Sequence, residues 1–181
     1  MMNKVDLNSP VISIDQIVSR AGYSFSLNDN YWALDKNIRL PVHEIYELID
    51  KKILPSYLKT LRYYAENLSS AHTNNIHTYM MHMLRSVRSE KIDEVALINY
   101  RAALDKGNEY YLGTIRGFLR RWHELGYAGV SDDVIELLDG WIIKGNVKGD
   151  VIKRLDPVKG PLSDIELQAF NEGAIQAFER I

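Results

Sequence analysis

Residues 108–125, which read NEYYLGTIRGFLRRWHEL, hold the pattern that decides the fold. Apolar side chains recur in this stretch at steps of three and four residues, which is the spacing of one face of an α-helix. The members of this apolar stripe are Tyr111, Leu112, Ile115, Phe118, Leu119 and Trp122. Asn108 is expected to cap the start of the helix, and Gly126 is expected to end it in a left-handed conformation. We therefore predict a central helix with a buried aromatic stripe.

The opposite side of this predicted helix carries glycine and arginine. Gly113 and Gly117 lie four residues apart, and each costs a helix interior about 1 kcal/mol relative to alanine. Two reasons would justify that cost: close packing against another helix, or close approach of the backbone to a phosphate strand. Arg116, Arg120 and Arg121 form either a solvated face or a contact with nucleic acid, and we expect the second.

Further helices are predicted on both sides of this stretch. Prolines at positions 41 and 55 suit the first turn of a helix, because the missing N–H would be unpaired there anyway. A third helix is expected from about Thr73, acting as its cap, to Val87, and a fourth from about 92 to 104. Ser131 and the two acids after it predict the start of another helix. The predicted fold class is all-α, a small orthogonal bundle of about five or six helices.

The domain organisation is predicted from the segments that lack this helical pattern. We expect an irregular N-terminal extension (1–40) pinned by Trp32, a helical domain (41–145), a linker (146–162) and a final helical segment (163–181). The linker region holds glycines and mixed charge. Ser163 and Glu166 have the spacing of a capping box, which predicts that a last helix begins there.

Composition narrows the class of protein. The chain has 181 residues, of which 46% are hydrophobic, and it has no cysteine for disulfides or thiolate metal sites. No apolar run approaches the roughly 20 residues that a membrane helix needs. We therefore expect a soluble cytoplasmic protein. Its net charge of −2 is unevenly distributed: residues 51–130 carry 12 Lys and Arg against 7 Asp and Glu, whereas both flanks are acidic.

Polar side chains on the third predicted helix extend the nucleic-acid hypothesis. Asparagine can read adenine edges, arginine can read guanine or phosphate, and threonine and histidine can bind the backbone. The predicted DNA-binding residues are Thr73, Asn74, Asn75, His77, Arg85, Arg116, Arg120 and Arg121. We expect their positive groups to gather on one exposed side that two neighbouring helices build.

Catalytic and metal-binding patterns are missing from the sequence. None of the five histidines has a spacing that suits a metal site, and neither a nucleotide-binding glycine loop nor a hydrolase elbow is found. His82 and Arg85 form a His-x-x-Arg pair, which we interpret as chance because no other catalytic residue is placed around it. We expect no cofactor, no metal site and no catalytic residue.

Three stretches together resemble a known family. Residues 71–88 (AHTNNIHTYMMHMLRSVR), 94–105 (EVALINYRAALD) and 110–130 (YYLGTIRGFLRRWHELGYAGV) resemble the core-binding domain of phage integrases, the tyrosine recombinases. Residues 155–170 (LDPVKGPLSDIELQAF) are similar to the junction where the catalytic domain of that family begins, which implies that 163–181 is the first helix of a truncated catalytic domain. The resemblance implies a SAM-like helical domain that forms half of a clamp around double-stranded DNA, with other recombinase protomers as further partners.

The same resemblance sets a limit on activity. The two arginines, the lysine, the histidines and the nucleophilic tyrosine of the family would all lie beyond residue 181. The chain is therefore expected to bind DNA but not to cut or join it, and none of its tyrosines is assigned as the nucleophile. The alternative function is a helical protein-interaction module, in which Tyr79, Met80, Met81 and Met83 form an adaptable apolar surface. Core packing is the other explanation for these methionines, and a stand-alone enzyme is the third class.

Overall fold

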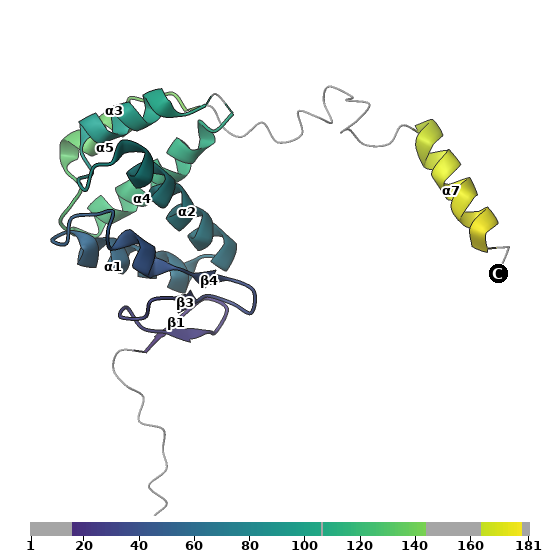
Figure 1. The fold of residues 1–181 in the computed structure, drawn as a ribbon, viewed down its shortest axis with the longest axis horizontal. Helices are drawn as coiled ribbons and strands as arrows, with labels where there is room; N and C mark the ends of the chain where they lie inside the picture. Colours follow the sequence, from purple (N-terminus) through teal and green to yellow (C-terminus); the bar gives the residue numbers. More distant parts are fainter. Residues whose placement is uncertain (1–15, 106, 144–163, 179–181) are drawn as a thin grey trace, which may run out of the picture. The chain divides into compact units, whose positions relative to one another are not determined.

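The computed structural model describes residues 16–105, 107–143 and 164–178, and it divides the chain into two compact units, 1–145 and 146–181. The first unit is a small bundle of helices, as predicted (Figure 1). Its helices are α1 (Leu54–Asn67), α2 (Ser70–Val87), α3 (Glu94–Ala103), α4 (Tyr110–Glu124) and α5 (Asp132–Asp139). A short 3-10 helix, η1 (Val42–Ile45), follows Pro41 in place of the longer helix that we expected there.

Helix α4 is the centre of the bundle and packs against α1, α2 and α5. The predicted stripe is buried at Leu112, Ile115, Phe118, Leu119 and Trp122, whereas Tyr111 is half-buried. Gly126 has a φ of 71°, the left-handed conformation predicted for it. The predicted cap at Asn108 is wrong, because α4 begins at Tyr110 and Glu109 is the residue at the cap position. Asn108 accepts a hydrogen bond only through its backbone carbonyl, from the Tyr111 N–H at 2.9 Å.

The start of α2 also differs from the prediction. Ser69, four residues before Thr73, is the capping residue, and its hydroxyl accepts a hydrogen bond from the His72 N–H at 3.3 Å. The predicted cap of α5 is confirmed, because the Ser131 hydroxyl accepts from the Val134 N–H at 3.4 Å. The acids that follow Ser131 lie in the first turn of α5, where the positive end of the helix dipole favours them.

The described residues before η1 are mostly irregular, as predicted, and include two small antiparallel hairpins. Strand β1 (Ile17–Val18) pairs with β2 (Ser24–Phe25), and β3 (Trp32–Ala33) pairs with β4 (Arg39–Leu40). Trp32 is fully buried, and its ring stacks on Phe25 at 4.7 Å between centroids. Alternation of apolar and polar side chains allows each two-residue strand to bury one face. The hairpins therefore contribute to the same hydrophobic core as the helices.

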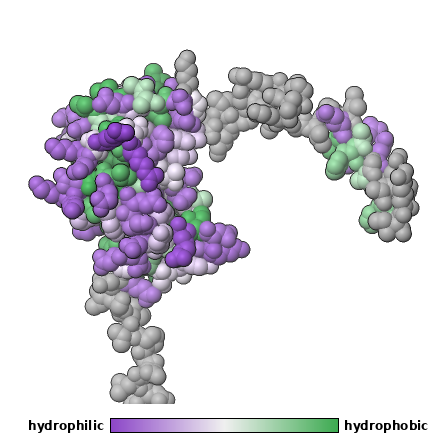
Figure 2. All heavy atoms as spheres, in the orientation of Figure 1, coloured by the Kyte–Doolittle hydropathy of each residue, from purple (hydrophilic) through white to green (hydrophobic). Residues whose placement is uncertain are grey.

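The methionines of α2 belong to this core. Met80, Met81 and Met83 are 0%, 4% and 0% exposed, respectively. The adaptable methionine surface of the alternative function is therefore wrong, because an interaction surface must be exposed. Figure 2 shows a face of the protein on which hydrophilic residues predominate and apolar residues form smaller areas.

The second unit contains helix α7 (Asp164–Phe178), whose side chains Leu167, Phe170, Ile175 and Phe178 are exposed. The predicted linker (146–162) and Ser163 of the predicted capping box lie outside the described residues. None of the helices within the described ranges is long and apolar enough to cross a membrane.

Candidate nucleic-acid interface

Two packed helices carry almost no acidic residues. No Asp or Glu occurs between Glu66 and Glu90, so α2 has none, and none occurs between Glu109 and Glu124. Helix α4 thus has only Glu124, at its last residue. The chain has 24 acidic residues in total, so these two neighbouring helices contribute almost none of its negative charge, although Glu44 of η1 pairs with Arg85 of α2. Low negative charge favours the approach of a polyanion.

Two of the predicted DNA-binding residues on α2 lie in the core. Thr73 is fully buried, and its hydroxyl donates to the Ser69 carbonyl at 3.3 Å. His77 is 3% exposed, and its Nδ1 lies 2.9 Å from the Tyr57 hydroxyl. Burial lowers the pKa of His77 to about 4, although the Pro41 carbonyl and the Glu44 carboxylate favour its charged form. The prediction that Thr73 and His77 face DNA is therefore wrong.

The other polar residues of α2 do face solvent. Asn75 is exposed and Asn74 is half-buried, and neither side chain has a partner among the described residues. Thr78, His82, Arg85 and Ser86 continue this exposed side toward the C-terminus of the helix. Asn75, Thr78, His82 and Arg85 follow one another at three- or four-residue steps, so they form one continuous polar face along α2.

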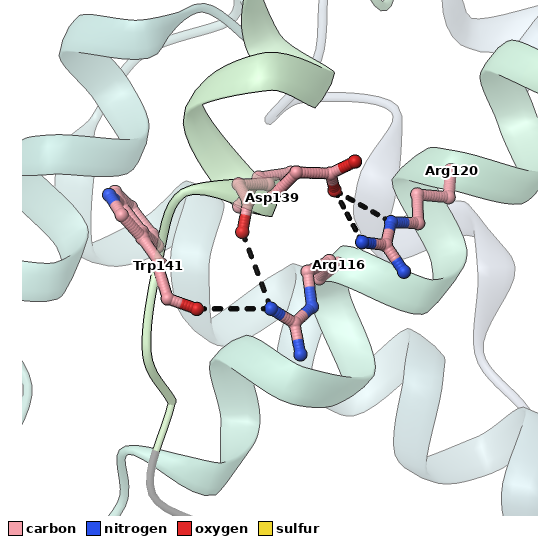
Figure 3. Close-up of polar contacts among 5 residues, drawn as sticks. Arg116, Arg120, Asp139 and Trp141 are labelled. Atoms are coloured by element: carbon pink, nitrogen blue, oxygen red, sulfur yellow. Dashed lines mark hydrogen bonds and ion pairs between the residues drawn. The ribbon is translucent and has the colours of Figure 1, made fainter.

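Arg116 and Arg120 hold α5 against α4 (Figure 3). The Arg116 guanidinium donates to the carbonyls of Leu138 at 3.4 Å and Trp141 at 3.2 Å, and Arg120 Nε donates to the Asp139 carboxylate at 2.8 Å. The last carbonyls of a helix have no partner within it, and α5 has no basic residue in its last turn. These two arginines therefore supply from α4 the donors and the positive charge that the end of α5 lacks.

The remaining two predicted arginines point elsewhere. Arg85 pairs with Glu44 of η1 at 2.7 Å, and Arg121 pairs with Glu124 at 2.9 Å while lying 4.9 Å from the centre of the Tyr63 ring. The four guanidinium groups are thus directed toward η1, α1 and α5, and each has a partner. The prediction of a single exposed arginine face is wrong, because the acids, carbonyls and ring that the four side chains contact lie in different directions.

The glycines of α4 face open space. A Cβ atom added at Gly113 or Gly117 would meet no other atom within 4 Å, so close helix packing does not explain either glycine. Of the two reasons considered from the sequence, only the close approach of an outside group remains. We call the backbone at Gly113, which is half-buried, and at Gly117, which is exposed, the glycine lane.

Ring contacts join α2 to α4, and one of them involves the polar face of α2, because the His82 ring lies 5.5 Å from that of Tyr111. The Tyr64 hydroxyl donates to the Gly117 carbonyl at 3.0 Å, while the Tyr64 ring lies 6.1 Å from that of His72 on α2. Two turns further along α2, the Tyr79 ring stacks on Tyr111 of α4 at 4.0 Å between centroids. Both helices therefore contribute to one surface.

Comparisons with protein families, with curated proteins and with solved structures gave no significant match to this chain. Within the described ranges, no three His, Cys, Asp or Glu side chains lie close enough together to hold a metal ion.

Proposed function

We propose that this chain is the DNA-binding, core-binding portion of a phage-type tyrosine recombinase, and that it contacts double-stranded DNA through α2 and α4. The observation that carries the proposal is the pair of neighbouring helices with Glu124 as their one acidic residue, and with two glycines on α4 that packing does not explain. The resemblance of residues 71–130 to the core-binding domain supplies the class. In this proposal the fragment itself does not cut or join DNA, works in the cytoplasm, and has other recombinase protomers as further partners.

In the proposed complex, the polar face of α2 and the glycine lane make different contacts with DNA. Asn75, Thr78 and Arg85 offer hydrogen bonds to bases or phosphates, and Asn74 adds to them where its half-buried amide is reached. The glycine lane has no side chains to hold a phosphate strand away, so the strand can pack against the helix itself. Arg121 follows Gly117 by one turn of α4, and its side chain is exposed and can contact the same DNA strand.

The ion pairs of Arg85 and Arg121 permit an exchange of partners. Both pairs lie at the surface, with arginine side chains 58% and 40% exposed, and such pairs contribute roughly 0–1 kcal/mol. A DNA phosphate can therefore replace the carboxylate at little cost. Arg116 is different, because leaving α5 would strand two carbonyls, and we assign it to structure.

Fluorescence anisotropy of a labelled duplex, measured at about 50 and 200 mM salt, tests the proposal. We expect a dissociation constant in roughly the micromolar range or weaker at the higher salt. The logarithm of the association constant should fall by about 0.9 per phosphate contact for each tenfold rise in salt concentration. Absence of binding at the lower salt, or binding that salt does not alter, would overturn the proposal.

A charge-neutralising variant tests the exchange of partners directly. Glu44→Gln frees Arg85 from its carboxylate and should strengthen DNA binding, because phosphate no longer competes with Glu44. Glu47→Gln is the matched control, since Glu47 is an exposed acid three residues away with no ion pair among the described residues. Equal effects of the two variants would show that only net charge matters.

A further inference from the structure

A polar hollow lies between α2 and the connection from α3 to α4. It encloses about 490 Å³ and is lined by Thr78, His82, Arg85, Ser86, Ala103, Leu104, Asp105 and Asn108. Hydrogen-bond donors dominate the α2 side of this hollow, and Asp105 is the acid among its lining residues. The hollow shares Thr78, His82, Arg85 and Ser86 with the polar face of α2. The glycine lane, on α4, does not line it.

A buried tyrosine sets the orientation and the tautomer of His82. Tyr100 is fully buried, and its hydroxyl lies 2.8 Å from His82 Nδ1. If the tyrosine only accepted, its own proton would remain unpaired in the core, so we infer that its O–H donates to Nδ1. Burial raises the pKa of Tyr100, which keeps that proton in place. Neutral His82 then carries its proton on Nε2, the nitrogen that does not face Tyr100.

Arg85 supplies the positive charge beside this N–H. Its Nη2 is bound to Glu44, but a guanidinium has further N–H donors that remain for another acceptor. Thr78 and Ser86 add hydroxyl donors within the same hollow. An imidazole N–H, a guanidinium and two hydroxyls around one hollow match the acceptor-rich oxygens of a phosphate group.

The geometry points to this hollow as the seat of one phosphodiester group of the bound DNA, held by His82, Arg85 and Thr78. This assignment rests on the proposed function and deepens it. Tyr100 is a positioning residue in this scheme, because it acts only through His82.

Anisotropy with the labelled duplex on hollow variants tests the assignment. His82→Phe and Thr78→Val should each weaken binding several-fold, and Arg85→Gln should weaken it about tenfold. Arg88→Gln is the matched control for Arg85→Gln, because Arg88 is an exposed cation of the same helix end that does not line the hollow. The control should change binding by much less.

The tautomer of His82 provides a second measurement, and a general loss of stability would not change it. Nitrogen NMR of the histidine rings should show His82 protonated on Nε2 in the free protein, and a duplex should shift that resonance. Tyr100→Phe should release the tautomer and weaken binding by less than His82→Phe does.

The two proposals fail in different ways. If the unaltered chain binds the duplex but His82→Phe, Thr78→Val and Arg85→Gln bind no differently from Arg88→Gln, the hollow holds no phosphate and the proposed function stands. If the unaltered chain does not bind at low salt, the proposed function is overturned and this assignment falls with it.

Discussion

Replacing Gly113 and Gly117 of α4 by alanine should make the protein more stable and weaken its binding to DNA. A Cβ at Gly113 or Gly117 meets no atom within 4 Å, so neither alanine creates a clash. Glycine in a helix interior is less favourable than alanine by about 1 kcal/mol per residue. The double variant should therefore raise the free energy of unfolding by about 2 kcal/mol and the melting temperature by roughly 5 °C or more.

The same two methyl groups should weaken binding. They project into the glycine lane, where a phosphate strand would otherwise pack against the helix, and they hold that strand away by about the thickness of a methyl group. Calorimetry and duplex anisotropy on the same samples measure both effects. Stability and binding normally change in the same direction when a variant damages a fold, so opposite changes are informative.

Asn99→Ala provides the control. Asn99 is an exposed residue of α3 outside the proposed surface, and the change to alanine raises helix propensity by about half a kcal/mol. It should stabilise the protein without changing DNA binding. If the glycine variants are stabilised but bind DNA as tightly as the unaltered chain, the glycine lane does not touch DNA, and a fall in stability would refute the open geometry itself.

Three further expectations concern the fold. Arg116→Ala should lower the unfolding free energy in urea by about 1–2 kcal/mol because two carbonyls lose their donor, whereas Arg120→Ala should cost under about 1 kcal/mol; equal costs would contradict the structural role of Arg116. Met83→Ala should cost about 2–5 kcal/mol, and a negligible loss would contradict its burial. His77 has a pKa of about 4 when folded against about 6.5 when unfolded, so the unfolded chain binds more protons between these values. Stability should therefore be level above pH 6.5 and fall by up to roughly 3 kcal/mol as the pH approaches 4, and His77→Gln should remove this component of the slope.

The helices could be predicted because burial in a helix leaves a local trace in the sequence. The stripe from Leu112 to Trp122 and the cap at Ser131 each involve residues within a few positions of one another. The start of α2 was predicted at the wrong residue because Ser69 and Thr73 are both good capping residues. Thr73 falls on the buried side of the helix, where its hydroxyl bonds back to the Ser69 carbonyl.

The candidate site could be predicted only in part, because partners of charged side chains are distant in sequence. Arg85 and Glu44 are 41 residues apart, and Arg116 reaches carbonyls 22 and 25 residues away. The helical pattern indicated correctly that these arginines leave the core, but it contains no information about which acid or carbonyl each one meets. His77 was misplaced for the opposite reason, since a polar residue can be buried when a partner such as Tyr57 is present.

Because the arginines do not form one exposed face, the proposed DNA binding by this chain depends on other features of α2 and α4. A count of cations treats every arginine as available, but pairing with Glu44, Asp139 and Glu124 cancels much of that charge. Helix α2 and residues 110–123 of α4 contain no acid of their own, so the negative charge beside them comes from residues such as Glu44 and Glu124. Binding should then depend on hydrogen bonds and close backbone approach, with few released counterions. A salt slope equivalent to only about two or three phosphate contacts fits that arrangement, whereas a slope near ten would require a cationic surface that α2 and α4 do not provide.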